Sequence, residues 1–278
     1  MCLAVIAWQS HPEYPLVVVA NRDEFYTRST RAAAWWGQNV SLLAGRDEEA
    51  GGAWFGINRR GRFALLTNVR SPAERNPHAP SRGAVVLASL QSHESIGEWL
   101  RDLSPRAQVF NGFNLLVGDP LDLGVRQPGE LHYFSNRLSA ETTLLQPGIY
   151  GLSNASLDSP WPKVTRTVSR FATQIAQKIS IDALLHMMAD RSVATDRELP
   201  STGVPLDWER ALSAVQIRAN GYGTRSTTVL TVRADGVANF VERTFDPSAP
   251  DQHADRFFEF TIGAGQRVST SLGGPRAK

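Results

Sequence analysis

The chain has 278 residues, of which 29 are Lys or Arg and 27 are Asp or Glu, so the formal net charge is only +2. Hydrophobic residues make up 42% and charged residues 20%, the balance of an ordinary folded protein and not of a disordered, collagenous or coiled-coil chain. The small net charge and the lack of any Lys/Arg-rich run argue against nucleic acid or a membrane surface as the partner.

The numbers and spacing of the cysteines and histidines further narrow the possible classes of protein. A single cysteine permits no internal disulfide, which fits a reducing compartment, and we expect a cytoplasmic protein. The six histidines fall at no zinc-site spacing, so we expect no metal site. No apolar run approaches the roughly 18 residues of a membrane-spanning helix, and no basic segment precedes one, so neither a transmembrane segment nor a signal peptide is expected.

The first half of the chain predicts two β-hairpins and two helices. The apolar runs Leu3–Trp8 and Pro15–Ala20 indicate paired strands buried on both faces. After a region to Leu43 without a clear pattern, Gly52–Ile57 and Arg62–Val69 flank an Asn- and Gly-containing turn and predict a second hairpin. The helices are expected over 81–91 and 95–103, each with a serine at its start.

The second half returns to strands around a helical segment. Apolar residues at positions 161, 164, 168, 171, 175 and 179 recur at helical spacing and predict a helix, followed by a further helix over about 181–190 and a loop to about Trp208. Strands are expected at Asn114–Gly118, Leu131–Ser135, Gly148–Leu152, Ala214–Ile217, Tyr222–Arg233, Val237–Asp246 and Phe257–Ile262.

The grouping of these elements predicts the fold class. Strands in clusters with helices grouped between them favour an α+β arrangement over a doubly wound sheet. No repeat or linker is evident, so residues 1–263 are expected to form one domain and residues 264–278 a flexible, Gly/Ser/Arg-rich tail.

Cys2 is the most informative residue for chemistry. Removal of Met1 would leave its thiol on the same residue as a free α-amine. The reference pKa of such an amine is about 7.7–8.0, so the amine can accept the thiol proton near neutral pH. Position alone also allows a different interpretation, in which a lone cysteine at the start of an apolar strand is a small buried hydrophobe.

A polar tetrad follows the second strand of the first hairpin, which should bring it near the start of the Cys2 strand. Its members are Asn21, Arg22, Asp23 and Glu24. An arginine there would stabilise a thiolate, and an aspartate could hold the α-amine or the arginine. A solvated charged turn is the alternative.

Several short segments, taken in order, resemble the NRDE family, the homologues of the transport and Golgi organisation protein 2. These segments are Met1-Cys2, Asn21–Glu24, Gly51–Asn58, Leu66–Arg70, Gly151–Asn154, Leu157–Lys163 and Arg225–Thr228. The resemblance runs from Met1 to about Val232. That family in turn resembles the N-terminal nucleophile (Ntn) hydrolases of the cholylglycine hydrolase and penicillin V acylase type.

The resemblance implies an Ntn hydrolase-like four-layer αββα sandwich and a set of site residues. Cys2 would be the nucleophile, Asn68 half of an oxyanion hole, Asn154 an asparagine that orients the amine or the substrate carbonyl, and Arg225 an arginine near the nucleophile. From the residues alone, Asn68 and Asn154 are equally compatible with strand-end or turn positions, and Arg225 with a solvated strand arginine.

One departure affects the tetrad. In the hydrolases the arginine precedes its aspartate by three positions, whereas Arg22 and Asp23 are adjacent here. Either Arg22 or Asn21 could therefore take the place of the arginine.

Two functions follow from the resemblance. The first is an Ntn-type amidohydrolase or acyl transferase that acts on an amide or thioester of a small amphipathic molecule and needs no cofactor. The second is a non-catalytic binding or trafficking protein for haem or acyl-CoA. Asn21, Glu24 and Trp54 are expected to contribute to ligand binding in either case. The sequence leaves a homo-oligomer open.

Overall fold

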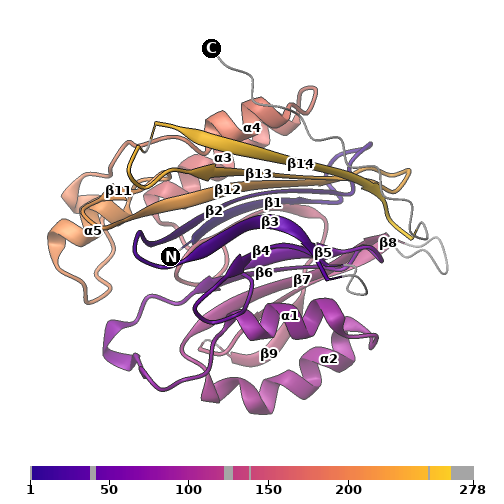
Figure 1. Cartoon of the computed structure of the whole chain (residues 1–278), viewed down its shortest axis with the longest axis horizontal. Helices are drawn as coiled ribbons and strands as arrows, with labels where there is room; N and C mark the ends of the chain where they lie inside the picture. Colours follow the sequence, from indigo (N-terminus) through magenta and orange to yellow (C-terminus); the bar gives the residue numbers. More distant parts are fainter. Residues whose placement is uncertain (1, 38–41, 122–127, 138, 250, 264–278) are drawn as a thin grey trace.

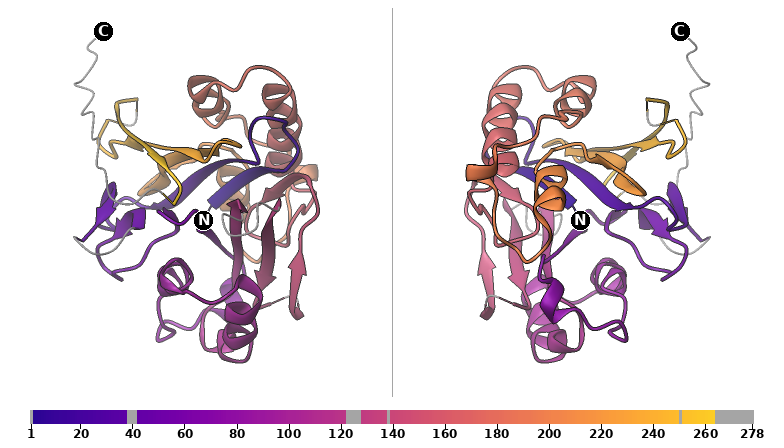
Figure 2. Two further views of the ribbon diagram at one scale, coloured as in Figure 1. Left: turned by 90° about the vertical axis from the view of Figure 1, so that its right-hand side faces the viewer. Right: turned by 90° about the vertical axis from the view of Figure 1, so that its left-hand side faces the viewer.

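A computed structural model of the chain describes residues 2–263 except 38–41, 122–127, 138 and 250. The expected flexible tail over 264–278 lies outside these residues. Two seven-stranded sheets stack face to face, and helices cover their outer faces (Figures 1 and 2). Among the described residues, the strand pairings within both sheets are antiparallel.

The first sheet contains the amino-terminal strand, which lies second from one edge. Its strands in spatial order are β10 (Gly148–Leu152), β1 (Cys2–Trp8), β2 (Leu16–Phe25), β12 (Tyr222–Val232), β13 (Val237–Phe245) and β14 (His253–Thr261), with β11 (Arg218–Ala219) paired to β12. Helices α3 (Pro162–Ile175) and α4 (Ile181–Met187) cover its outer face, and α5 (Leu206–Leu212) lies near the β11 end (Figure 1).

The second sheet follows chain order. Its strands are β3 (Thr30–Trp36), β4 (Leu42–Asp47), β5 (Phe55–Asn58), β6 (Phe63–Asn68), β7 (Phe113–Leu121), β8 (Pro128–Ser135) and β9 (Ser139–Leu144). Helices α1 (Gly83–Gln91) and α2 (Ile96–Leu103) cover its outer face (Figure 2). Three 3-10 turns connect the elements, at Pro72–Glu74, Ser104–Val109 and Asp196–Glu198.

Side-chain alternation along the strands separates three apolar layers. In β1, Ala4 and Ile6 pack between the two sheets, whereas Leu3 and Val5 pack beneath α3 and α4. A third layer joins the second sheet to α1 and α2, with Val86 and Leu90 at its centre. The four-layer αββα sandwich is therefore confirmed, and burial on both faces explains why the first two strands are continuous apolar runs.

Some expected elements differ from the structure. The predicted strand Ala214–Ile217 is wrong, because this buried segment is irregular and its backbone bonds to loops: the Gln216 N–H donates to the Asp190 carbonyl (2.8 Å). The helix expected to continue to Ile179 ends at Ile175. Strands β3, β4 and β9 and helix α5 were not predicted. Among the described residues, no helix is both long and apolar enough to span a bilayer.

Candidate active site

Cys2 begins β1 and lies opposite Arg22 in the neighbouring strand β2. It has the same parity as Ala4 and Ile6, so its side chain is on the side of the sheet that faces the second sheet. There it lines a cavity of about 350 Å³ together with residues from both sheets, among them Trp54 and Asn68. We call this space the nucleophile cavity.

Arg22 shares the nucleophile cavity with Cys2 and is held from three directions. Its guanidinium donates to the Thr30 hydroxyl (3.0 Å), lies 3.8 Å from the Asp47 carboxylate and stacks 4.2 Å from the ring centre of Trp54. Gly45 leaves room for that ring, since a Cβ there would lie 2.4 Å from it. The expected approach of the tetrad to Cys2 is thus met by Arg22 and not by Asn21.

The electrostatics around the thiol work in both directions. Burial raises the pKa of Cys2, and the Asp23 charge adds to this effect. The positive charge of Arg22 and a hydrogen bond from the Asp23 backbone N–H favour the thiolate and oppose the rise in the pKa. The thiol therefore needs its base and its cations in order to react near neutral pH.

Asp23 is 1% exposed and lies on the helix side of the first sheet. Its carboxylate accepts a 2.6 Å hydrogen bond from the Thr224 hydroxyl of β12. Burial raises the pKa of Asp23, whereas Lys163 and Arg22 lower it. A buried carboxylate thus lies directly beside the amino-terminal residue, as the tetrad predicted.

Asn68 lines the nucleophile cavity, whereas Asn154 lies behind it and contacts Asn68. Asn68 ends β6 and lines this cavity, and its side-chain amide makes no hydrogen bond with the other described residues. Asn154 is 1% exposed, and its Nδ2 donates to the Asn68 carbonyl (2.8 Å) while its Oδ1 accepts from Ser153 (3.2 Å). Asn154 therefore positions Asn68, whose amide faces the cavity.

Two expected site residues lie elsewhere. Asn21 points to the helix side of β2, where its Nδ2 donates to the carbonyls of Val215 (2.8 Å) and Met188 (3.0 Å). Arg225 is the extra residue of a bulge in β12, and its guanidinium donates to the carbonyls of Phe25 (3.0 Å) and Arg28 (2.9 Å). Neither residue lines the nucleophile cavity, because these backbone groups already hold their side chains.

Replacing Arg225 by Ala tests this placement. We expect the free energy of unfolding to fall by about 1–3 kcal/mol, because charge-assisted hydrogen bonds to the turn after β2 are lost. The reactivity of Cys2 with an acyl donor should stay at the wild-type rate. Urea unfolding measures the stability, and the acylation rate measures the reactivity of Cys2. Slower acylation at unchanged stability would mean that Arg225 takes part in the site.

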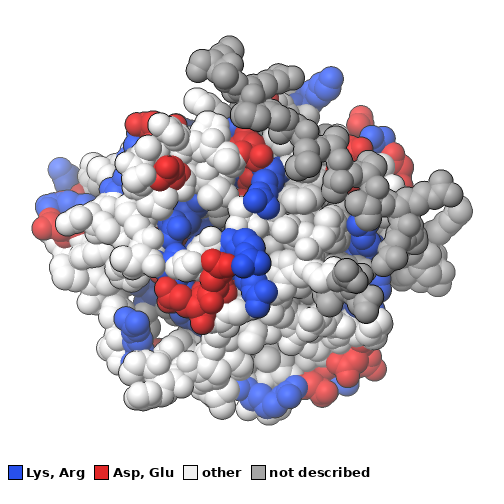
Figure 3. All heavy atoms as spheres, viewed as in Figure 1, with Lys and Arg blue, Asp and Glu red and all other residues white. Residues whose placement is uncertain are grey.

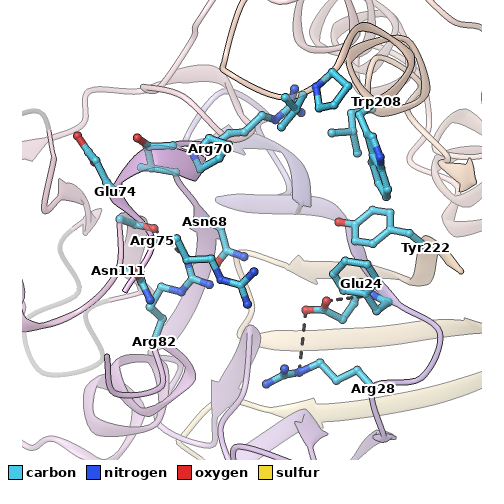
Figure 4. A pocket seen from close by; sticks show the side chains of 18 residues that line it. Glu24, Arg28, Asn68, Arg70, Glu74, Arg75, Arg82, Asn111, Trp208 and Tyr222 are labelled. Atoms are coloured by element: carbon cyan, nitrogen blue, oxygen red, sulfur yellow. Dashed lines mark hydrogen bonds and ion pairs between the residues drawn. The ribbon is translucent and has the colours of Figure 1, made fainter. Parts of the chain in front are cut away.

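A second cavity of about 440 Å³ adjoins the first. The two share Glu24, Arg28, Asn68, Arg82 and Asn111, so they form one continuous cleft. Figure 4 shows the aromatic rings of Trp208 and Tyr222 on one wall and the guanidinium groups of Arg75 and Arg82 on the other. We call this space the aromatic cavity.

The cleft also carries acidic groups. Glu24 lines both cavities, 4.0 Å from Arg28, and Arg28 donates to the Asp47 carboxylate (2.8 Å). Acidic and basic side chains gather in mixed groups on the face shown in Figure 3. Glu24 and Trp54 therefore line the cleft, whereas Asn21 lies outside it; a part for Glu24 and Trp54 in ligand binding stays a prediction.

A buried charge cluster beside the cleft was not predicted from the sequence, and its member Arg70 lines the aromatic cavity. Arg70 contacts the Glu209 carboxylate at 2.7 Å, with side chains 3% and 5% exposed, and lies 4.8 Å from the ring centre of Trp161. Lys163, in the first turn of α3, is 1% exposed. Arg70 and Lys163 lie within segments that carry the NRDE resemblance, which was the only available signal, and Glu209 had none.

The fold and this site define an αββα sandwich with a cysteine at the start of an interior strand and a two-part cleft beside it. The family model for Transport and Golgi organisation 2 matches residues 1–247, and the chain belongs to this family. It is 34% identical to the Transport and Golgi organization protein 2 homolog of Bos taurus, over 94% of this chain and 99% of the relative.

Two solved structures share the fold of this chain at low sequence identity. The N-acylethanolamine-hydrolyzing acid amidase ortholog of Caenorhabditis elegans is 12% identical, with a TM-score of 0.43 over 82% of this chain and 92% of that one. The C2A mutant of conjugated bile acid hydrolase from Clostridium perfringens is 10% identical, with a TM-score of 0.41 over 97% of this chain and 100% of that one.

Proposed function

We propose that the protein is an Ntn-type amidohydrolase or acyl transferase that acts on an amide or thioester of a small amphipathic molecule. The observation that carries the proposal is the position of the Cys2 thiol. It lies in the nucleophile cavity at the start of an interior strand, with Arg22 opposite it in β2 and Asn68 of the second sheet lining the same cavity. The NRDE resemblance supports the same assignment.

The reaction needs no group beyond the chain and its substrate. After removal of Met1, the α-amine of Cys2 takes the thiol proton and the sulfur attacks the carbonyl carbon. The Asn68 amide donates to the oxyanion that forms. The C–N or C–S bond then breaks, the α-ammonium protonates the leaving group, and the acyl group remains on sulfur as a thioester. Water or an amine attacks this thioester, and the acyl–sulfur bond breaks to release the acid or the new amide. The proton lost by the water or amine passes through the α-amine to the sulfur.

The two-part cleft suits an amphipathic substrate. The wall of Phe25, Trp208 and Tyr222 can take an apolar body next to the nucleophile cavity. Arg28 and Arg82, which line both cavities, can contact a polar or anionic group on the same molecule. The boundary between the cavities, where Asn68 lies, is where the scissile bond would sit.

The test is the intact mass of the processed protein after treatment with acyl amides and acyl thioesters. Since Cys2 is the only cysteine in the chain, one added acyl group reports on this thiol. We expect the adduct to form and then to decay in the wild type, and to be absent in Cys2→Ala. In Cys2→Ser it should form more slowly, because a hydroxyl is a weaker nucleophile at neutral pH. A processed wild type that stays inert to every donor would contradict the proposal.

A second candidate function is the binding of haem or acyl-CoA without turnover. It is favoured by the rise in the Cys2 pKa caused by burial and by the arginines opposite an aromatic wall, which suit an acidic amphipathic ligand. Haem would place its ring against Trp208 and Tyr222 and its carboxylates near Arg75 and Arg82. A saturable Soret shift on adding haem, or saturable acyl-CoA binding, with no acylation of Cys2 would favour this function over catalysis.

A further inference from the structure

Lys163 is a buried cation without a hydrogen-bonding partner in the part of the chain that the structure describes. It is the second residue of α3, it is 1% exposed, and its Nζ contacts no hydrogen-bond acceptor among these residues. Burying an ammonium group in this way costs several kcal/mol unless nearby charges compensate. Such a residue therefore calls for an explanation beyond packing.

The position of Lys163 in its helix makes the cost higher. The amino-terminal end of a helix carries a partial positive charge, which disfavours a cation in the first turn. Only three of the 29 basic residues in the chain are lysines, and Lys163 is the buried one of the two that are described. An arginine would keep its charge at any physiological pH, whereas a buried lysine can give up its proton. The sequence thus places a titratable cation here.

The charged groups around Lys163 come from several elements. The pKa of Lys163 is lowered to about 8 overall: burial and the nearby Arg70 lower it, whereas Asp23 of β2, Cys2 of β1 and Glu209 of α5 partly offset them by raising it. Asp23 is the largest of these compensating charges. Glu209 already contacts Arg70 at 2.7 Å, so the charge of Lys163 acts mainly on Asp23 and on the Cys2 thiol.

We propose that Lys163 is a positioning residue of the Cys2 site. From the helix side of the first sheet, its ε-ammonium offsets the negative charge of the buried Asp23 carboxylate and thereby stabilises the Cys2 thiolate. This proposal rests on the proposed function, because a Cys2 thiol that ionises near neutral pH matters for catalysis only if Cys2 is the nucleophile. The ionisation itself is a property of the free protein and can be measured without any substrate.

The test is the rate of Cys2 alkylation by iodoacetamide as a function of pH, followed by intact mass on the full chain without Met1. Only the thiolate reacts, so the pH profile reports the thiol pKa. Lys163→Met keeps the length of the side chain and removes the charge. We expect its profile to move to higher pH, with alkylation at pH 7.5 slowed about tenfold for each unit by which the thiol pKa rises. Lys163→Arg, which keeps the charge, should restore the rate.

Lys178→Met is the matched control, because Lys178 is exposed just beyond the end of α3. Its profile should coincide with that of the wild type. If Lys163→Met alkylates at the wild-type rate at every pH, the proposal is overturned. If its profile shifts but no acyl donor ever modifies Cys2, the role of Lys163 holds and the proposed function fails.

A measurement on the wild type covers the case in which the Lys163 variants do not fold. The three lysines give three signals in protein labelled with ¹³C-lysine. We expect one signal to titrate near pH 8 and to titrate at lower pH once Cys2 is alkylated, because the negative charge of the thiolate is then absent. Three signals that titrate together near the ordinary lysine value of about 10.4, unmoved by alkylation, would overturn the proposal.

Discussion

Replacing Asn68 by Ala is expected to slow the acylation of Cys2 by about 10²–10³-fold, the usual cost of losing one oxyanion donor. The reason is geometric: the Asn68 side chain ends β6 in the nucleophile cavity, while its backbone carbonyl is held by Asn154 at 2.8 Å. The stability of the fold should change little, because this side-chain amide makes no hydrogen bond within the part of the chain that the structure describes. Single-turnover acylation followed by intact mass measures the effect.

Asn239→Ala provides the control for Asn68→Ala. Asn239 is a half-buried asparagine of β13 that lines neither cavity of the cleft. Acylation of Cys2 in Asn239→Ala should proceed at the wild-type rate. If Asn68→Ala also acylates at the wild-type rate, the oxyanion role belongs to another group and the description of the site is wrong.

Glu209→Gln is expected to lower the free energy of unfolding by about 3–5 kcal/mol, the range measured when one partner of a buried ion pair is removed. Glu209 accepts from the Arg70 guanidinium (2.7 Å), the Thr202 hydroxyl (2.6 Å) and the Thr202 N–H (2.8 Å). The amide keeps the shape of the side chain but not the charge that faces Arg70. Urea unfolding monitored by tryptophan fluorescence measures the loss.

The neighbouring residue offers the comparison for Glu209→Gln. Arg210 pairs with Asp196 (2.7 Å) and Asp207 (2.7 Å), but its side chain is 43% exposed. Exposed ion pairs contribute about 0–1 kcal/mol, so Arg210→Ala should unfold close to the wild type. Equal losses in the two variants would mean that burial does not set the strength of the Arg70–Glu209 contact.

Much of the fold could be predicted because its central strands are long apolar runs. Strands β1 and β2 are buried on both faces, and the turn between β5 and β6 carries Asn and Gly at the positions a hairpin needs. Strand β3 could not be predicted, since it is an edge strand with a bulge and only one fully buried residue. Helix α5 spans seven residues, which is too short to show a helical period.

The sequence predicted those parts of the site that follow from the pairing and side-chain alternation of neighbouring strands. The pairing of Cys2 with Arg22 follows from a hairpin of two apolar strands, and alternation then places Asn21 on the opposite face. The direction of Arg225 depends on a bulge between Thr224 and Ser226, which no pattern signals. Lys163 and Glu209 come from helices that meet the sheet only in three dimensions, so their proximity to Asp23 and Arg70 could not be read from spacing.

The central claim is that the free amine of Cys2 activates its own thiol, and releasing that amine on demand tests it most directly. A cleavable amino-terminal extension before Cys2 keeps the thiol present but converts the amine into an amide. If the free amine activates the thiol, the extended protein should stay inert to an acyl donor, and acylation of Cys2 should begin when the extension is removed. Equal acylation before and after removal would contradict the account.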